Sequence, residues 1–168
     1  GSKIKWASTT SRFNSSPAAV QINGYTETGA SKDWLISPKL RLDTFAEFPI
    51  LSFYSRKFHA GSALKLMVSV NYDGVSSPET ATWTAIEGDF PTVTGVFKQS
   101  KYINLQAYKT DHTYLAWVYE TITNDSDNAA EWTLDDISIT NETNFVASNP
   151  ILNFGDTAPN TTSDSKSF

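Results

Sequence analysis

The sequence "LKLMVSVNY", residues 64–72, carries an apolar side chain at every second position. Side chains along a β-strand point alternately to its two faces, so a period of two assigns these apolar groups to one face. That face holds Leu64, Leu66, Val68, Val70 and Tyr72. The stretch therefore predicts a strand that packs one face against a core and presents the other to water.

A second stretch, "YLAWVYETI" at residues 114–122, is apolar on both of its faces. Leu115 and Trp117 fall on one side, while Ala116 and Val118 fall on the other. Burial on both faces is typical of a central strand in a sandwich of two sheets. Weaker alternation predicts further strands at residues 50–58, 101–105 and 132–140.

Turn-forming residues separate these runs. They occur at Asn23-Gly24, Ser37-Pro38, Asp73-Gly74, residues 76–78 and residues 124–128. No stretch shows helical periodicity over three turns, and the sequence contains no internal repeat. Many short strands with regular turns predict an all-β protein, either a sandwich or a barrel.

The length of 168 residues suits one domain with its own hydrophobic core. After Phe154 the sequence becomes polar and rich in turn-forming residues. We therefore predict a single domain over residues 1–148 and a C-terminal tail or linker over residues 149–168. Within that tail, residues 150–154 could add one edge strand.

Charge and cysteine content exclude several functions. The chain has no cysteine, which excludes disulfides, thiolate catalysis and zinc–thiolate sites. A formal net charge of −5 gives no electrostatic basis for binding nucleic acid. No apolar run approaches the ~20 residues of a membrane span. Residues 110–165 contain ten Asp and Glu but no Lys or Arg, which indicates either a solvated acidic face or a cation site.

Recognisable catalytic motifs are missing from the sequence. It has no glycine-rich phosphate loop, no paired-histidine zinc motif and no nucleophile elbow. The two histidines, His59 and His112, are far apart and have no motif around them. We therefore predict that the protein is not an enzyme. Paired carboxylates could still serve a hydrolytic, glycan-processing domain, which is kept as an alternative.

The sequence "LDDI", residues 134–137, places two carboxylates in the predicted closing strand. In a regular strand Asp135 shares a face with Ile137 and Ile139. A carboxylate turned toward apolar side chains is costly unless it is paired or bound to a metal, and calcium suits oxygen ligands in irregular geometry. Two alternatives stay open: a bulge that turns both Asp135 and Asp136 outward, or backbone N–H groups that hydrogen-bond Asp135.

The block "DWLISPKLRLD", residues 33–43, puts Trp34 and Ile36 on one face of a strand. The strand ends at Ser37-Pro38, because proline cannot donate to the ladder. We expect Trp34 to be a core aromatic rather than a sugar platform. Asp33 could reach the closing segment, because the first and last strands of Greek-key sandwiches commonly neighbour each other.

Several blocks carry a resemblance when taken in their order and spacing over residues 6–140. They are Trp-Leu-Ile-Ser-Pro, the turn Val-Ser-x-x-Tyr-Asp-Gly followed by Ala-Thr-Trp-Thr, and the closing Trp-x-Leu-Asp-Asp-Ile. With these blocks the chain resembles the choice-of-anchor J family of Bacteroidetes surface proteins. That family is related to the cleaved-adhesin modules of gingipain-type proteases and more distantly to MAM domains.

The resemblance implies a jelly-roll-like antiparallel β-sandwich with a structural calcium ion near the closing strand. It assigns that ion first to Asp135, with Asp33 and Asp136 as further ligand candidates. Relatives begin with an extra strand that carries an acidic residue before the position of Trp6. This chain starts at "SKIKW", so we expect the cation site to lack that ligand.

The resemblance also implies a non-catalytic adhesion or carbohydrate-binding module, exported to the bacterial surface or outer membrane. Because the sequence has no signal peptide and opens with Gly1-Ser2, we expect it to be a piece excised from a longer precursor. The expected partner is a glycan, or a host or matrix protein. Sugar binding needs an exposed aromatic face, and the candidates, each of which could instead be a packing residue, are Tyr25, Tyr72, Trp83 and Tyr102. A passive spacer of a multidomain surface lipoprotein is the other alternative.

Overall fold

The computed structural model describes residues 5–26, 29–121 and 129–143, and these residues form nine β-strands and four short 3₁₀ helices. The strands are β1 (Ala7–Thr9), β2 (Ala19–Asn23), β3 (Ser31–Ile36), β4 (Phe48–Phe58), β5 (Lys65–Ser69), β6 (Thr84–Ile86), β7 (Phe97–Asn104), β8 (Tyr114–Thr121) and β9 (Glu131–Glu142). The 3₁₀ helices are η1 (Gly24–Thr26), η2 (Leu42–Thr44), η3 (Pro78–Thr80) and η4 (Gln106–Tyr108). The predicted tail at 149–168 lies outside the described residues.

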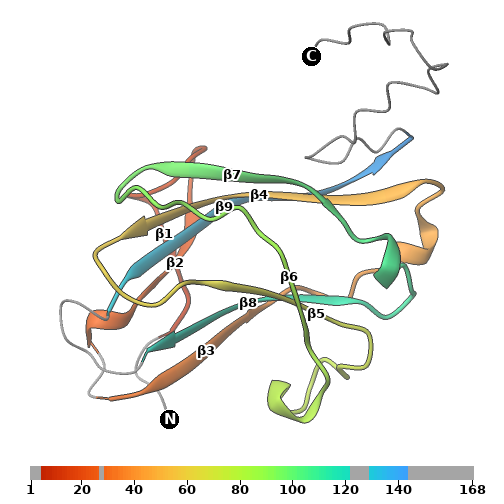
Figure 1. The fold of residues 1–168 in the computed structure, drawn as a ribbon, viewed down its shortest axis with the longest axis horizontal. Coiled ribbons are helices and arrows are strands. Elements are labelled where there is room, and N and C mark those ends of the chain that lie inside the picture. Colours follow the sequence, from red (N-terminus) through yellow and green to blue (C-terminus); the bar gives the residue numbers. More distant parts are fainter. Residues whose placement is uncertain (1–4, 27–28, 122–128, 144–168) are drawn as a thin grey trace, which may run out of the picture.

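The strands form two antiparallel sheets that face each other (Figure 1). One sheet has the order β1-β2-β9-β4-β7 and the other has the order β3-β8-β5-β6. From β2 to β9 the chain crosses between the sheets after every strand except β5, which is followed by its neighbour β6. This is the connectivity of a jelly roll, so the predicted all-β, jelly-roll-like antiparallel β-sandwich is confirmed.

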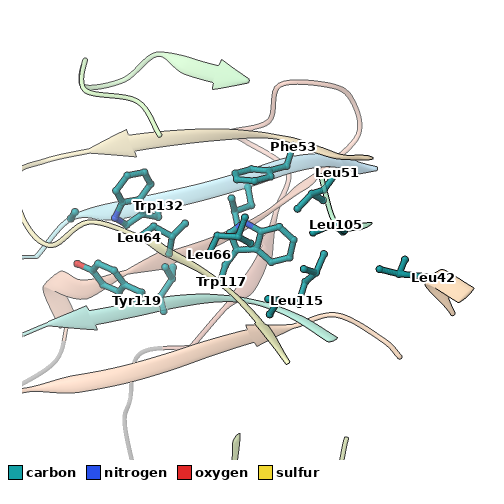
Figure 2. Close-up of a cluster of buried hydrophobic side chains, with 14 residues drawn as sticks. Leu42, Leu51, Phe53, Leu64, Leu66, Leu105, Leu115, Trp117, Tyr119 and Trp132 are labelled. Atoms are coloured by element: carbon teal, nitrogen blue, oxygen red, sulfur yellow. The ribbon is translucent and has the colours of Figure 1, made fainter. Parts of the chain in front are cut away.

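Strand β8 is the central strand that its sequence predicted. It lies between β3 and β5, and all of its side chains are buried except Glu120, which is partly exposed. Its inward face meets the opposite sheet at Phe53, whose ring contacts the edge of Trp117 with 5.3 Å between centroids. Figure 2 shows this layer of side chains between the two sheets, from Trp132 and Tyr119 at one end to Leu42 at the other.

Strand β5 follows the predicted alternation only as far as Ser69. Leu66 and Val68 are buried in the core, but Val70 is 46% exposed, so its predicted place on the apolar face is wrong. The cause is the Ser69 hydroxyl, whose oxygen accepts the backbone N–H of Asn71 at 3.2 Å and of Tyr72 at 3.1 Å. These hydrogen bonds compete with those of the sheet and turn the chain after Ser69. Val70 therefore does not continue the strand.

Two β-bulges flank the long strand β4 at the level of Ser52 and Phe53. On one side, Phe53 of β4 faces both Asp136 and Ile137 of β9. On the other side, Ser52 faces both Lys101 and Tyr102 of β7. An extra residue bends its strand and reverses the faces of the residues that follow it.

The bulge in β9 corrects the expectation for its two aspartates. Asp135 is paired with Tyr54 on the outer face of the five-stranded sheet, whereas Ile139, beyond the bulge, is paired with Leu51 and packs against the core. The predicted sharing of one face by Asp135 and Ile139 is therefore wrong. Both alternatives that the sequence left open occur in the structure: β9 contains the bulge, and Asp135 accepts backbone N–H groups.

Candidate functional site

A cleft of 680 Å³ lies beside β7, the last strand of the five-stranded sheet. Within the described part of the chain, β7 is paired only with β4, so no strand covers its other edge and this edge can line the cleft. One wall of the cleft is the end of β6 with the segment that follows it, and the other wall is β7 from Gln99 onward. The residues that line the cleft are Ile86, Glu87, Gly88, Asp89, Gln99, Lys101, Tyr102, Ile103 and Asn104.

Tyr102 is the aromatic residue of this cleft, and its backbone is unusual. It is 52% exposed, and its φ angle of 61° lies in the left-handed region that bulky side chains rarely adopt. The bulge in β7 creates this conformation, which costs about 1–2 kcal/mol for an L-residue. The Lys101 ammonium lies 5.4 Å from the centre of its ring. Strained backbone of this kind is concentrated at functional sites.

Polar groups from both walls accompany the ring of Tyr102. The Gln99 side-chain oxygen accepts a hydrogen bond from the Tyr54 hydroxyl at 3.3 Å, which orients its amide and leaves both amide N–H groups to donate elsewhere. Asp89 is ion-paired with Lys98. Glu87 is exposed and makes no hydrogen bond or ion pair with any described residue. An exposed ring with amide and carboxylate groups around it can bind a polar ligand that has an apolar face.

Two of the other predicted ligand residues, Tyr72 and Trp83, pack against neighbouring side chains. Tyr72 is buried, and its hydroxyl donates to the Ser76 carbonyl at 3.0 Å. Trp83 is partly buried, and its indole N–H donates to the Pro78 carbonyl at 2.8 Å. Their rings lie 5.5 Å apart, and Tyr72 also contacts Tyr114 edge-on at 5.1 Å. Both residues belong to an aromatic row on the outer face of the four-stranded sheet.

Trp34 lies in the same row, which corrects its assignment to the core. It is paired with Val118 and points away from the opposite sheet, while its neighbour Leu35 packs against the core. Its ring lies 5.1 Å from that of Trp83, and the Lys32 ammonium lies 4.9 Å from its centre. A period of two gives the residues that share a face, but it does not say which face is the inner one.

Tyr25 stands in a different place from Tyr102. It is 60% exposed and lines a separate pocket of 320 Å³ together with Asn23, His59 and Ala129. Of the four predicted aromatic residues, Tyr102 is therefore the one that the structure combines with polar side chains from two walls of a cleft.

The three predicted metal ligands do not come together. Asp33 is on β3 of the four-stranded sheet, opposite Tyr119, whereas Asp135 and Asp136 are on β9 of the other sheet. Asp33 instead lies near Tyr119. Burial is the main cause that raises the pKa of Tyr119 to about 12, and the negative charge of Asp33 adds a smaller contribution. Among residues 5–26, 29–121 and 129–143, no group of three or more His, Cys, Asp or Glu side chains is placed to hold a metal ion.

The groups around Asp135 are hydrogen-bond donors rather than further oxygen ligands. Its Oδ2 accepts the backbone N–H of Asn14 at 2.7 Å and of Ser15 at 2.9 Å, and its Oδ1 accepts the N–H of Asp136 at 2.8 Å. Calcium takes 6–8 oxygen ligands. The described residues around Asp135 therefore do not fit a calcium ion at this carboxylate.

Glu131 is a site residue that sequence reasoning missed. It is only 2% exposed. Its carboxylate forms ion pairs with Arg12 and, at 3.1 Å, with Arg56, and it accepts a hydrogen bond from the Asn23 amide at 3.3 Å. The Arg56 guanidinium also lies 4.8 Å from the centre of the Phe58 ring. No local pattern could reveal this arrangement, because Arg12 and Glu131 are 119 positions apart.

No family model matches this chain, and no curated protein does either. Solved structures do match it. The K1 cleaved adhesin domain of Lys-gingipain from Porphyromonas gingivalis W83 is 16% identical, with 83% of this chain and 85% of that chain covered and a TM-score of 0.54. A family 30 carbohydrate-binding module is 15% identical, with 94% and 80% covered and a TM-score of 0.53.

The family 30 carbohydrate-binding module of a cellulosomal cellulase from Clostridium thermocellum is 17% identical, with 83% and 84% covered and a TM-score of 0.50. These likenesses are likenesses of fold. At such low identity they show a shared sandwich, and the chemistry of the site has to be argued from its own residues.

Proposed function

We propose that the protein is a non-catalytic adhesion module that binds a glycan in the cleft beside β7. The observation that carries the proposal is Tyr102, whose exposed ring lines this cleft and whose backbone has a strained left-handed conformation. Sugar rings combine apolar faces with hydroxyl groups, so they suit an aromatic side chain beside amide and carboxylate groups. The fold supports the proposal by analogy, because solved structures of this fold include carbohydrate-binding modules and a cleaved adhesin domain.

The cleft does not favour the hydrolytic alternative. Glycoside hydrolysis needs two carboxyl groups on either side of the scissile bond. The carboxylates that line the cleft, Glu87 and Asp89, come from the same wall and are two positions apart, and Asp89 is ion-paired with Lys98. We expect no new reducing ends when the protein is incubated with a glycan that it binds.

We further propose that the module acts outside the cell, at a bacterial surface, as a member or relative of the choice-of-anchor J family. Extracellular binding is the setting that a cleaved adhesin domain suggests by analogy. None of the helices in the described ranges is long and apolar enough to cross a membrane.

The substitution Tyr102→Gly tests the glycan site without damaging the fold. Glycine adopts a φ of 61° without strain, so the variant should melt at the same temperature as the wild type or higher. Loss of the ring should weaken binding about 10- to 100-fold, measured by calorimetry on a ligand selected from an array of plant, host and microbial glycans. Tyr102→Phe should bind nearly as well as the wild type.

Tyr25→Ala is the matched control, because it removes a similarly exposed ring from a separate pocket and should leave this affinity unchanged. If Tyr102→Gly binds the glycan as tightly as the wild type, the glycan binds somewhere other than this cleft. An array on which the wild type binds no glycan would contradict the proposal and favour a protein partner or a passive spacer.

A further inference from the structure

The segment between β1 and β2, residues 10–18, forms an N-terminal arm. It contacts the outer face of the five-stranded sheet, where β9 places three carboxylates. Each of these carboxylates receives at least one hydrogen bond from the arm. The three acceptors are Glu131, Asp135 and Asp136.

The arm meets Asp135 and Asp136 with two consecutive residues. Asn14 and Ser15 point their backbone N–H groups at the same oxygen of Asp135, at 2.7 and 2.9 Å. Successive backbone N–H groups that converge in this way form a small binding site for an anion. Asn14 also donates its side-chain amide to Asp136 at 2.8 Å, and the Ser15 hydroxyl donates to the same carboxylate.

The bonds to Asp136 favour its charged form. The Ser15 hydroxyl, followed by the Asn14 amide, holds the pKa of Asp136 below its ordinary value. Asp136 also occupies the bulge with a φ of 50°, so the arm fixes β9 where its pairing with β4 is interrupted. Hydrogen bonds to an ionised carboxylate are shorter and stronger than those between neutral groups.

At the start of β9 the arm supplies a positive charge as well. Glu131 is almost completely buried, and a buried carboxylate is costly unless it is paired. Arg12 from the arm and Arg56 from β4 both donate to it, one to each of its oxygens. The two guanidinium groups lie 6.0 and 4.8 Å from the centre of the Phe58 ring.

We propose that the N-terminal arm takes the place of a metal ion in this protein. The arm neutralises Glu131 and hydrogen-bonds Asp135 and Asp136, so the folded domain does not depend on calcium. A cation at Oδ2 of Asp135 would have to displace the two N–H donors that already point at this oxygen, and Oδ1 already accepts the N–H of Asp136. This inference departs from the calcium ion that the family resemblance implies, and it is independent of the glycan site.

Thermal melting of the full chain tests the inference with three variants. In the wild type, excess calcium and excess chelator should give the same midpoint, because only a ligand that binds the native state raises it. Arg12→Met and Ser15→Ala should each lower the midpoint by about 3 °C, since each removes a bond to a charged group. Ser11→Ala is the matched control, because among the described residues its hydroxyl hydrogen-bonds only the neutral hydroxyl of Thr9, and it should leave the midpoint unchanged.

Amide hydrogen exchange of the wild type gives a reading that does not depend on whether a variant folds. The N–H groups of Asn14 and Ser15 should exchange at least about tenfold more slowly than exposed amides, and equally slowly with calcium or chelator. Fast exchange at both positions would overturn the proposal. A midpoint that rises with calcium, together with metal found by elemental analysis, would overturn it as well.

Discussion

Single residues fix the turn after β5, and Asp73 is the clearest case. Its carboxylate accepts the backbone N–H groups of Val75 at 2.9 Å and Ser76 at 2.8 Å, and it also accepts the Ser76 hydroxyl. These bonds, with the Ser76 hydroxyl as the largest cause, lower the pKa of Asp73 to about 2. Gly74 completes the turn with a φ of 80°, and a Cβ there would lie 2.5 Å from the Tyr114 hydroxyl oxygen.

The lowered pKa predicts how Asp73 responds to acid. Because the carboxyl binds its proton more weakly in the folded state, its contribution to stability is complete above about pH 4 and is lost as the pH falls toward 2. An NMR titration should find the midpoint of Asp73 near 2 and should find it higher in Ser76→Ala. Ser77→Ala, which removes the neighbouring hydroxyl, is the control and should not move it. An unchanged midpoint in Ser76→Ala would show that the hydroxyl is not the main cause.

At this scale the sequence identified Asp73-Gly74 as a turn, because these residue types favour turns by their local chemistry. It also placed Tyr102 among the ligand candidates, and the structure leaves that residue exposed beside the cleft. It could not separate Tyr102 from the buried Tyr72. Exposure depends on what the rest of the chain packs over a side chain, and that information is not local.

At the scale of elements, β3 shows how the sandwich protects an edge. In the described part of the chain it pairs only with β8, so its other edge is not covered by a strand. Asp33 lies on the face of β3 that it shares with Tyr119, the inner face of the sheet. Inward-pointing charges on edge strands discourage the addition of another strand. We infer that Asp33 prevents association of this edge.

The variant Asp33→Val tests this role. Valine favours the extended conformation and removes the charge, so the variant should form dimers or larger species by edge-to-edge pairing, measured by light scattering after size-exclusion chromatography. Asp111→Val makes the same exchange at an exposed position outside the strands, and it should leave the oligomeric state of the wild type unchanged. A wild-type oligomeric state for Asp33→Val across the accessible concentrations would exclude this explanation.

Alternation predicted β5 and β8 because it is a local property of each strand, but it did not predict the bulges. In β9 a signal was nonetheless present. The apolar series Trp132 and Leu134 falls on even positions, while Ile137 and Ile139 fall on odd ones, which is the shift that one extra residue produces. In β7 no such shift marks Tyr102, because pairing with a distant strand decides where that bulge lies.

At the scale of the whole molecule, the order of strands in the two sheets could not be read from periodicity. Alternation and turns limit the chain to a sandwich or a barrel, and the jelly-roll connectivity followed from the resemblance. The contacts that join first and last elements, such as the arm on β9, depend on that connectivity. This explains why strands with a clear alternation, such as β5 and β8, were predicted while the partners of Asp135 and Glu131 were not.

The two sheets are held together by one apolar layer, so a cavity in that layer should weaken the entire domain. Phe53 is fully buried and contacts Trp117 and Phe90 across it. Phe53→Ala should lower the free energy of unfolding by about 3–5 kcal/mol, measured by chemical denaturation, because it removes buried apolar surface and leaves a cavity. Phe13→Ala removes a ring that is 38% exposed and should cost much less. Equal losses for the two variants would mean that the layer between the sheets does not dominate stability.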